Sequence, residues 1–116
     1  MDPTAADELI DAYFDSLDTT DYDTIVEIMA DDIELVTGGG EVYRGIDDVG
    51  AYYRDVRGDR DSTHETNRRR YGDGFAVAEG DATLDDGDGL IESEFCDVFD
   101  FSDGKLARVA IYSRRS

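Results

Sequence analysis

One aspartate occupies an apolar row in which an ionised side chain is costly. Residues 91–101 read I-E-S-E-F-C-D-V-F-D-F, and alternate side chains of a β-strand share a face, so Phe95, Asp97 and Phe99 are expected to lie together. Apolar neighbours remove water from a carboxyl group and favour its protonated form, which can donate a hydrogen bond. The pattern predicts that Asp97 lies inside a pocket; an acid that is ion-paired or solvated is the alternative interpretation.

Tyr13 is the second candidate, and it belongs to a stripe of apolar residues with helical spacing. The stripe consists of Leu9, Ile10, Tyr13, Phe14 and Leu17, and most acids of residues 7–18 fall on the other side. A tyrosine at such a position either packs in the core with any partner for its hydroxyl, or presents that hydroxyl to a ligand. We predict that Tyr13 joins Asp97 at the polar end of the pocket.

A histidine, three consecutive arginines and a cysteine are the other reactive side chains. His64 is the only histidine and is interpreted as a structural or surface residue, with a place at the cavity mouth as the alternative. Arg68, Arg69 and Arg70 are expected to pair with surface acids or to lie at a dimer face, although one turned inward would admit an anionic ligand. Cys96 falls on the strand face opposite Asp97 without a nearby base, so no nucleophilic role is predicted.

No group of residues has the spacing of a metal site, and neither a metal nor a cofactor is predicted. The acidic run Asp85-Asp86-Gly87-Asp88-Gly89 lacks the periodic ligands and the terminal glutamate of a calcium-binding loop. It is interpreted as a hairpin turn. The single cysteine excludes an internal disulfide and is typical of a reducing compartment.

The chain is strongly acidic, with 30 Asp and Glu against 11 Lys and Arg and a net charge of −19. Salt screens the repulsion among so many carboxylates, so we interpret the protein as cytoplasmic and halophilic. Phosphate recognition requires clustered bases, and nucleic acid is therefore not an expected partner. The chain opens without a leader-like segment and has no apolar run long enough to span a bilayer, so neither secretion nor membrane insertion is expected.

The elements that position these residues are predicted as helices first and strands second. Helices are expected over 7–18 with Thr4 as N-cap, from Asp21 to about Asp31, and from Ile46 to Gly58. Strands are expected over 33–36, 42–43, 63–71, 75–84, 90–101 and 106–113, the last four joined by short glycine-containing turns. This order predicts one α+β domain, residues 1–116, whose helices cover one face of an antiparallel sheet.

Three segments resemble the nuclear transport factor 2-like superfamily, which includes ketosteroid isomerases, SnoaL-like polyketide cyclases and limonene epoxide hydrolases. They are D-Y-D-T-I-V-E-I-M-A-D-D-I, Y-R-G-I-D-D-V and F-C-D-V-F-D-F-S-D-G-K-L, in this order. The resemblance implies a cone, in which a strongly curved antiparallel sheet wraps around three N-terminal helices and encloses a mainly apolar pocket. It also implies a homodimer formed through the outer face of the sheet.

The resemblance to ketosteroid isomerases assigns oxyanion binding to Tyr13 and to Asp97 as an uncharged acid, and it makes Tyr53 the hydrogen-bond partner of Tyr13. Their general base falls on Thr37, whose hydroxyl cannot take a proton from carbon near neutral pH. The epoxide hydrolase pattern is also incomplete, because Ile111 stands where the last strand should carry an acid. The resemblance therefore implies half of an isomerase-like site without its base.

These observations together predict a pocket for a small hydrophobic molecule with a carbonyl, enol or phenol oxygen. Asp97 and Tyr13 are the candidate catalytic residues. The remaining lining is expected to consist of Phe14, Leu17, Leu35, Tyr53, Phe95 and Phe99. Binding is the favoured function; isomerase- or cyclase-like proton transfer on a carbonyl compound and a non-enzymatic dimerisation module are the alternatives.

Overall fold

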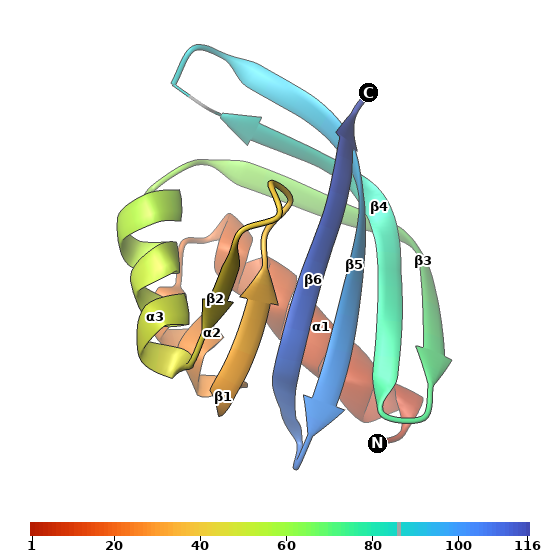
Figure 1. Ribbon diagram of the computed structural model, residues 1–116. Coiled ribbons are helices and arrows are strands. Elements are labelled where there is room, and N and C mark those ends of the chain that lie inside the picture. The colour runs from red at the N-terminus through yellow and green to blue at the C-terminus, as the bar shows by residue number, and fades with distance from the viewer. Residues whose placement is uncertain (86) are drawn as a thin grey trace.

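The computed structural model of the protein describes residues 1–85 and 87–116, and combines helices in the first half of the chain with a six-stranded sheet (Figure 1). The helical elements are α1 (Pro3–Asp18), α2 (Tyr22–Glu27), α3 (Ile46–Ala51) and η1 (Tyr52–Arg57). The strands are β1 (Met29–Val36), β2 (Val42–Arg44), β3 (Ser62–Gly72), β4 (Phe75–Asp85), β5 (Leu90–Ser102) and β6 (Lys105–Arg115). The predicted α+β class is confirmed. Asp86, within the predicted turn of residues 85–89, lies outside the described residues.

The first helix begins earlier than the sequence analysis predicted. Asp2, in extended backbone, accepts a hydrogen bond of 2.8 Å from the amide of Ala5, so Asp2 rather than Thr4 is the N-cap. Pro3 explains this start, because proline lacks an amide hydrogen and its fixed φ suits the first helical position. The capping interaction satisfies one of the otherwise unpaired amides of the helix N-terminus.

The second and third helical segments also differ from simple α-helices. α2 ends at Glu27 rather than near Asp31, because the chain from Met29 onward joins the sheet beside Leu106. α3 continues into η1, a stretch of π-helix that ends at Arg57 and is followed by Gly58, where φ is +61°. A π-helix has a wider turn than an α-helix, and this short stretch carries Tyr53 and Arg57 toward the sheet.

The sheet has the strand order β2-β1-β6-β5-β4-β3 and is antiparallel except where β1 runs parallel to β6. β3 to β6 are long and curved, and α1 lies across one face of them (Figure 1). A register shift between Thr66 and Arg68 lies opposite Gly80, where an added Cβ would sit 2.0 Å from the carbonyl oxygen of Glu65. Such an irregularity bends its strand and needs glycine for the close backbone approach.

The core fills the space between α1 and the concave face of the sheet. Phe95, Asp97 and Phe99 are all buried on that face, in agreement with the predicted alternation of β5. Among the described residues, Ser16, Thr37 and Asp97 are the buried polar or charged ones. None of the helices in this described part combines the length and apolar composition that a bilayer span requires.

Candidate functional site

A cavity of about 200 Å³ lies between η1, the C-terminal half of α1 and strands β3 to β6. Polar side chains reach it from several elements. They include Tyr13 of α1, Tyr53 and Arg57 of η1, Ser62 and His64 of β3, and Asp97 of β5, and hydroxyl side chains of β4, β5 and β6 add to them. Apolar contacts come from Leu17, Phe95 and Ile111. This is the composition of a small-molecule site, with an apolar wall and a few placed polar groups.

The predicted lining residues divide into two groups. Leu17, Tyr53 and Phe95 line the cavity together with Tyr13 and Asp97. The other three pack in the core behind the wall and are not among its lining residues: Phe14, Leu35 and Phe99. The rings of Phe14 and Phe99 pack edge-on against Tyr13, with centroids 5.2 and 5.3 Å away, so they support the tyrosine instead of facing the cavity.

Asp97 is 3% exposed, and its Oδ1 has no hydrogen-bond partner within the described chain. Burial raises the pKa of Asp97 to about 8, because an ionised carboxylate here would lose its hydration without gaining a partner. The carboxyl group is therefore protonated at neutral pH and can donate a hydrogen bond. An ion pair with arginine, the alternative interpretation of this residue, is absent among the described residues.

The hydroxyls of Tyr13 and Tyr53 are buried near Asp97. Neither meets the full geometry of a hydrogen bond, although the two lie close enough for a weak one that contributes to the pKa of both. Burial raises the pKa of both phenols, and the charge of Asp97 acts on each of them in the same direction. The two hydroxyls also influence each other's pKa, so they lie close together. Leaving a buried polar atom unpaired costs about 1–3 kcal/mol, and three such oxygens gather here.

A second polar group of the cavity is the pair formed by His64 and Asp18, the last residue of α1. His64 Nδ1 lies 2.6 Å from Asp18 Oδ1, and the His64 amide donates to Asp18 Oδ2 at 2.8 Å. Burial lowers the pKa of His64, Asp18 opposes this effect, and Arg57 adds to it. The ring packs between Phe14 and Phe95, at centroid distances of 5.2 and 5.5 Å.

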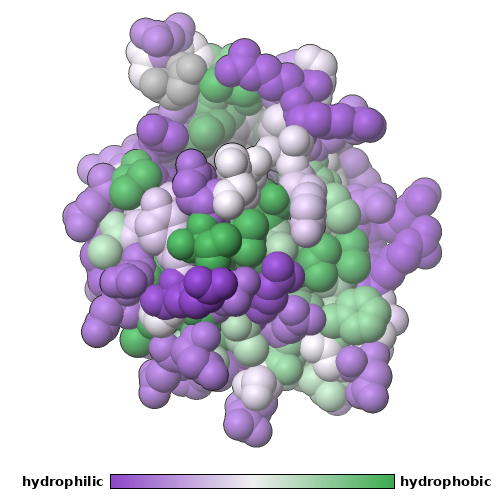
Figure 2. Space-filling model, in the orientation of Figure 1, coloured by the Kyte–Doolittle hydropathy of each residue, from purple (hydrophilic) through white to green (hydrophobic). Residues whose placement is uncertain are grey.

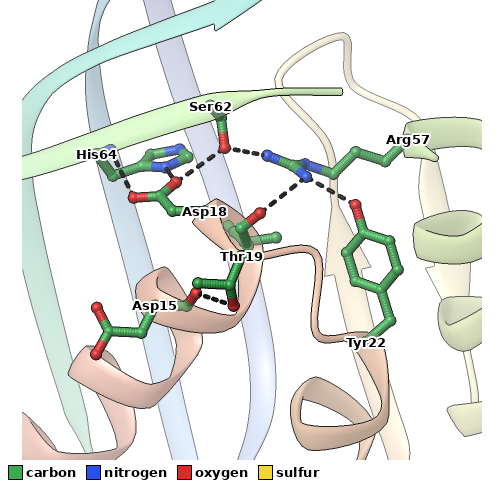
Figure 3. Close-up of polar contacts among 8 residues, drawn as sticks. Asp15, Asp18, Thr19, Tyr22, Arg57, Ser62 and His64 are labelled. Carbon is green, nitrogen blue, oxygen red and sulfur yellow. Dashed lines mark hydrogen bonds and ion pairs between the residues drawn. The ribbon is translucent and has the colours of Figure 1, made fainter. Parts of the chain in front are cut away.

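Arg57 continues this network toward α2, as Figure 3 shows. Its guanidinium donates to Ser62 Oγ at 2.6 Å, to Tyr22 Oη at 2.8 Å and to the Leu17 carbonyl at 3.3 Å. Ser62 in turn donates to Asp18 Oδ1 at 2.8 Å. The network ties the end of α1 to η1 and β3, and it holds the Asp18 carboxylate in place with three donated hydrogen bonds.

Thr37, where the isomerase-like base was expected, is buried but does not line the cavity. Its hydroxyl donates to the Glu41 carboxylate, and its amide donates to the Glu41 carbonyl at 2.9 Å. These contacts close the loop after β1. Thr37 is therefore a structural residue, and the cavity wall at this point is formed by Gly38.

The consecutive arginines lie away from the cavity. Arg69 forms ion pairs with Asp7 and Asp11 of α1, at 3.0 and 2.6 Å, as expected for pairing with surface acids. Arg68 lines a larger hollow of about 580 Å³ on the outer face of the sheet, and Arg70 is exposed on the same strand. That hollow includes Glu79, Glu94 and Arg114 but not the Asp97 side chain, so the smaller cavity is the candidate site.

Sequence reasoning missed Asp18, Arg57 and Ser62, and assigned His64 to the cavity only as an alternative. The alternation of Ser62 and His64 on one strand was the available signal, since both side chains then share a face. The described residues contain no group of three or more His, Cys, Asp and Glu side chains that could hold a metal ion.

The fold and its cavity place the chain in a known class of α+β cones. A SnoaL-like domain model matches residues 10–109, so the chain belongs to the SnoaL-like family of the nuclear transport factor 2-like superfamily, in agreement with the resemblance read from the sequence. No curated protein matches the chain.

Solved structures share the fold at low sequence identity. An LEH-like epoxide hydrolase from M. tuberculosis has a TM-score of 0.85 and 22% identity, and the match covers 96% of this chain and 84% of that one. A protein from Xanthomonas campestris, provisionally named a polyketide cyclase, has a TM-score of 0.82 and 19% identity, covering 94% and 90%. A protein from Kribbella flavida, provisionally named a ketosteroid isomerase, has a TM-score of 0.78 and 19% identity, and the match covers 97% of this chain and 80% of that one.

Proposed function

We propose that the protein binds a small neutral molecule through a carbonyl, enol or phenol oxygen. The observation that carries this proposal is the group of three buried oxygens, from Tyr13, Tyr53 and Asp97, that lack a partner of full hydrogen-bond geometry in a cavity with mixed polar and apolar lining. A ligand oxygen that accepts hydrogen bonds from these groups would satisfy them.

The size and charge of the cavity narrow the ligand class. A volume of about 200 Å³ is smaller than the roughly 300–1,000 Å³ of sites for drug-sized ligands, so the ligand is expected to have one ring or an equivalent chain. Arg57 is the only lysine or arginine on the described wall, and three of its hydrogen bonds go to Leu17, Tyr22 and Ser62. An anionic group would have to compete with these partners for Arg57, whereas the neutral Asp97 offers a donor to a ligand oxygen.

Calorimetric titration with phenol, cyclohexanone and benzoate tests this proposal. The two neutral probes are expected to bind and benzoate to bind poorly. Asp97→Leu removes the donor without leaving a buried charge, and it should weaken phenol binding about tenfold, which corresponds to one hydrogen bond of about 1.4 kcal/mol. Cys96→Ser, on the opposite face of the same strand, is the matched control. Unchanged phenol affinity in Asp97→Leu would reject the assigned role.

A non-enzymatic association module remains the second candidate, because one feature of the outer sheet face favours it. Figure 2 shows hydrophobic residues gathered over the strands among hydrophilic ones. The strand registers place an apolar row across five neighbouring strands on this face, which we call the outer valine row. It consists of Val42, Val36, Ala110, Val98 and Val77.

Sedimentation velocity distinguishes this candidate from a monomeric binder. A homodimer formed through the outer valine row should dissociate in Val98→Arg, because an uncompensated charge at the centre of an apolar contact is costly. Arg114→Ala, at the exposed end of β6, is the control. A wild-type protein that is monomeric at high concentration and in molar KCl would exclude the module.

A further inference from the structure

The candidate site lacks the base that an isomerase-like reaction requires at Thr37, but a different side chain of the same cavity has the properties of one. His64 reaches the cavity from β3, whereas Asp97 reaches it from β5. Nothing in the sequence resemblance assigns a role to His64 or Asp18. The question is therefore whether their geometry suits proton transfer.

The orientation of the His64 ring is fixed by one carboxylate. Asp18 Oδ1 binds ring Nδ1 at 2.6 Å, and Asp18 Oδ2 binds the backbone amide of the same residue at 2.8 Å. With Asp18 as acceptor, Nδ1 carries the ring proton and Nε2 keeps its lone pair. Among the described residues Nε2 has no hydrogen-bond partner, and His64 is one of the residues that line the cavity.

The Asp18 carboxylate is itself held by groups that a mobile surface acid would lack. Ser62 donates to Oδ1 at 2.8 Å and receives a hydrogen bond from Arg57 at 2.6 Å (Figure 3). A base oriented by a carboxylate, which is oriented in turn by other hydrogen bonds, is the arrangement that general-base catalysis uses. Phe14 and Phe95 pack against the ring and limit its rotation.

We propose that His64, positioned by Asp18, is the general base of a proton-transfer site whose acid end is Asp97. The inference rests on the proposed function, because it requires a carbonyl oxygen bound at Asp97 and Tyr13. It makes the protein an enzyme that acts on enolisable ketones.

The proposed reaction is enolisation of a ketone, with His64 as the base and with Asp97 and Tyr13 as the hydrogen-bond donors to the oxygen. His64 Nε2 removes a proton from the carbon next to the carbonyl group, and the electrons of that C–H bond form a C=C bond while the carbonyl π electrons move to oxygen. The resulting enolate accepts hydrogen bonds from the neutral Asp97 carboxyl and the Tyr13 hydroxyl. The imidazolium then returns its proton to the same carbon or to the γ-carbon of a β,γ-unsaturated ketone. Atoms and electrons balance without any co-reactant.

The surroundings of His64 and Asp97 favour an unprotonated imidazole and a protonated carboxyl group. Asp18 of α1 and Arg57 of η1 act on the His64 ring, and burial lowers its pKa below 6.5 overall. Burial raises the pKa of Asp97 on β5 to about 8. Between these values the base is unprotonated and the acid is protonated, so activity should follow a bell-shaped pH profile.

Hydrogen–deuterium exchange of cyclohexanone in D₂O, followed by proton NMR of its α-hydrogens, tests the inference. The wild-type protein should accelerate exchange, and His64→Gln should lower the rate at least about 100-fold while cyclohexanone still binds. Asp18→Asn should move the acidic limb of the pH profile to lower pH, since Asp18 raises the pKa of His64. Cys96→Ser, outside the cavity wall, should exchange at the wild-type rate.

The outcomes separate the two proposals. Binding of cyclohexanone without exchange, or exchange that persists in His64→Gln, overturns the base and leaves the binding site standing. Absence of binding by all neutral probes overturns both. If His64→Gln does not fold, the NMR titration of His64, the only histidine, must coincide with the acidic limb of the wild-type rate profile, and a mismatch rejects the assignment.

Discussion

The protonated state of Asp97 gives the structure a measurable dependence of stability on pH. The unfolded chain releases the Asp97 proton near pH 3.8, whereas the folded protein keeps it up to about pH 8. Between these values the folded state binds one proton more than the unfolded state, so folding stability contributed by this residue falls as the pH rises. Asp97→Asn replaces the acid by a neutral side chain of nearly the same shape and removes this dependence.

The expected magnitude follows from the two pKa values. Each pH unit inside the window is worth about 1.4 kcal/mol, so the stability of Asp97→Asn relative to the wild type should increase by roughly 3 kcal/mol between pH 5 and pH 7. The increase should end above about pH 8, where the folded wild-type protein also releases the proton. All other titrating groups are shared by the two proteins and cancel in the difference.

Urea denaturation of both proteins at a series of pH values, in constant molar KCl, measures this difference. Asp15→Asn, at an exposed position of α1, is the control for the loss of one carboxylate from the surface. A constant difference for Asp97→Asn would show that Asp97 titrates like an exposed aspartate. That result would remove the neutral donor on which the proposed binding function depends.

Three further predictions concern the surface, the sheet and the outer thiol. Because the net charge is −19, the melting temperature should rise by several degrees between 0.1 and 1 M KCl, as the electrostatic screening length falls from about 10 Å to about 3 Å. An unchanged melting temperature would reject the halophilic interpretation. Gly80→Ala should lower the free energy of unfolding, measured by urea denaturation, by about 2–4 kcal/mol, because the added Cβ meets the Glu65 carbonyl. Gly50→Ala is the control: its Cβ meets mainly the flexible end of Arg54, so the free energy of unfolding should not fall by this amount. Burial raises the pKa of Cys96 above its usual 9.0, so alkylation by iodoacetamide should reach half its maximal rate above pH 9; a midpoint below 9 would contradict the described environment.

Local patterns in the sequence predicted much of this fold because the information was carried by neighbouring residues. The apolar stripe of α1 and the alternation of β5 each concern side chains on one element. The stripe correctly predicted that Tyr13 is buried, and the alternation correctly predicted that Asp97 is buried. Even so, local signals misplaced the helix cap, since Pro3 made Asp2 a better N-cap than Thr4.

The rest of the site depends on contacts between distant segments. Asp18 and His64 are separated by 46 positions in sequence, and only the curvature of β3 over the end of α1 brings them together. Curvature also decides which apolar residues face the cavity, so that Phe95 lines it while Phe99, on the same strand face, packs behind Tyr13. The parallel pairing of β1 with β6 likewise has no local sequence signal.

The alternation of β5 joins two surfaces that would otherwise be independent. Asp97 faces the cavity and Val98, its neighbour, belongs to the outer valine row, so one layer of backbone separates a ligand from any partner seated on the outside. A partner that shifted this strand would change ligand affinity, and thermodynamic reciprocity requires the ligand to change the association constant by the same factor. Measuring the self-association constant with and without phenol would therefore detect ligand binding in the cavity through its effect on the outer face of the sheet.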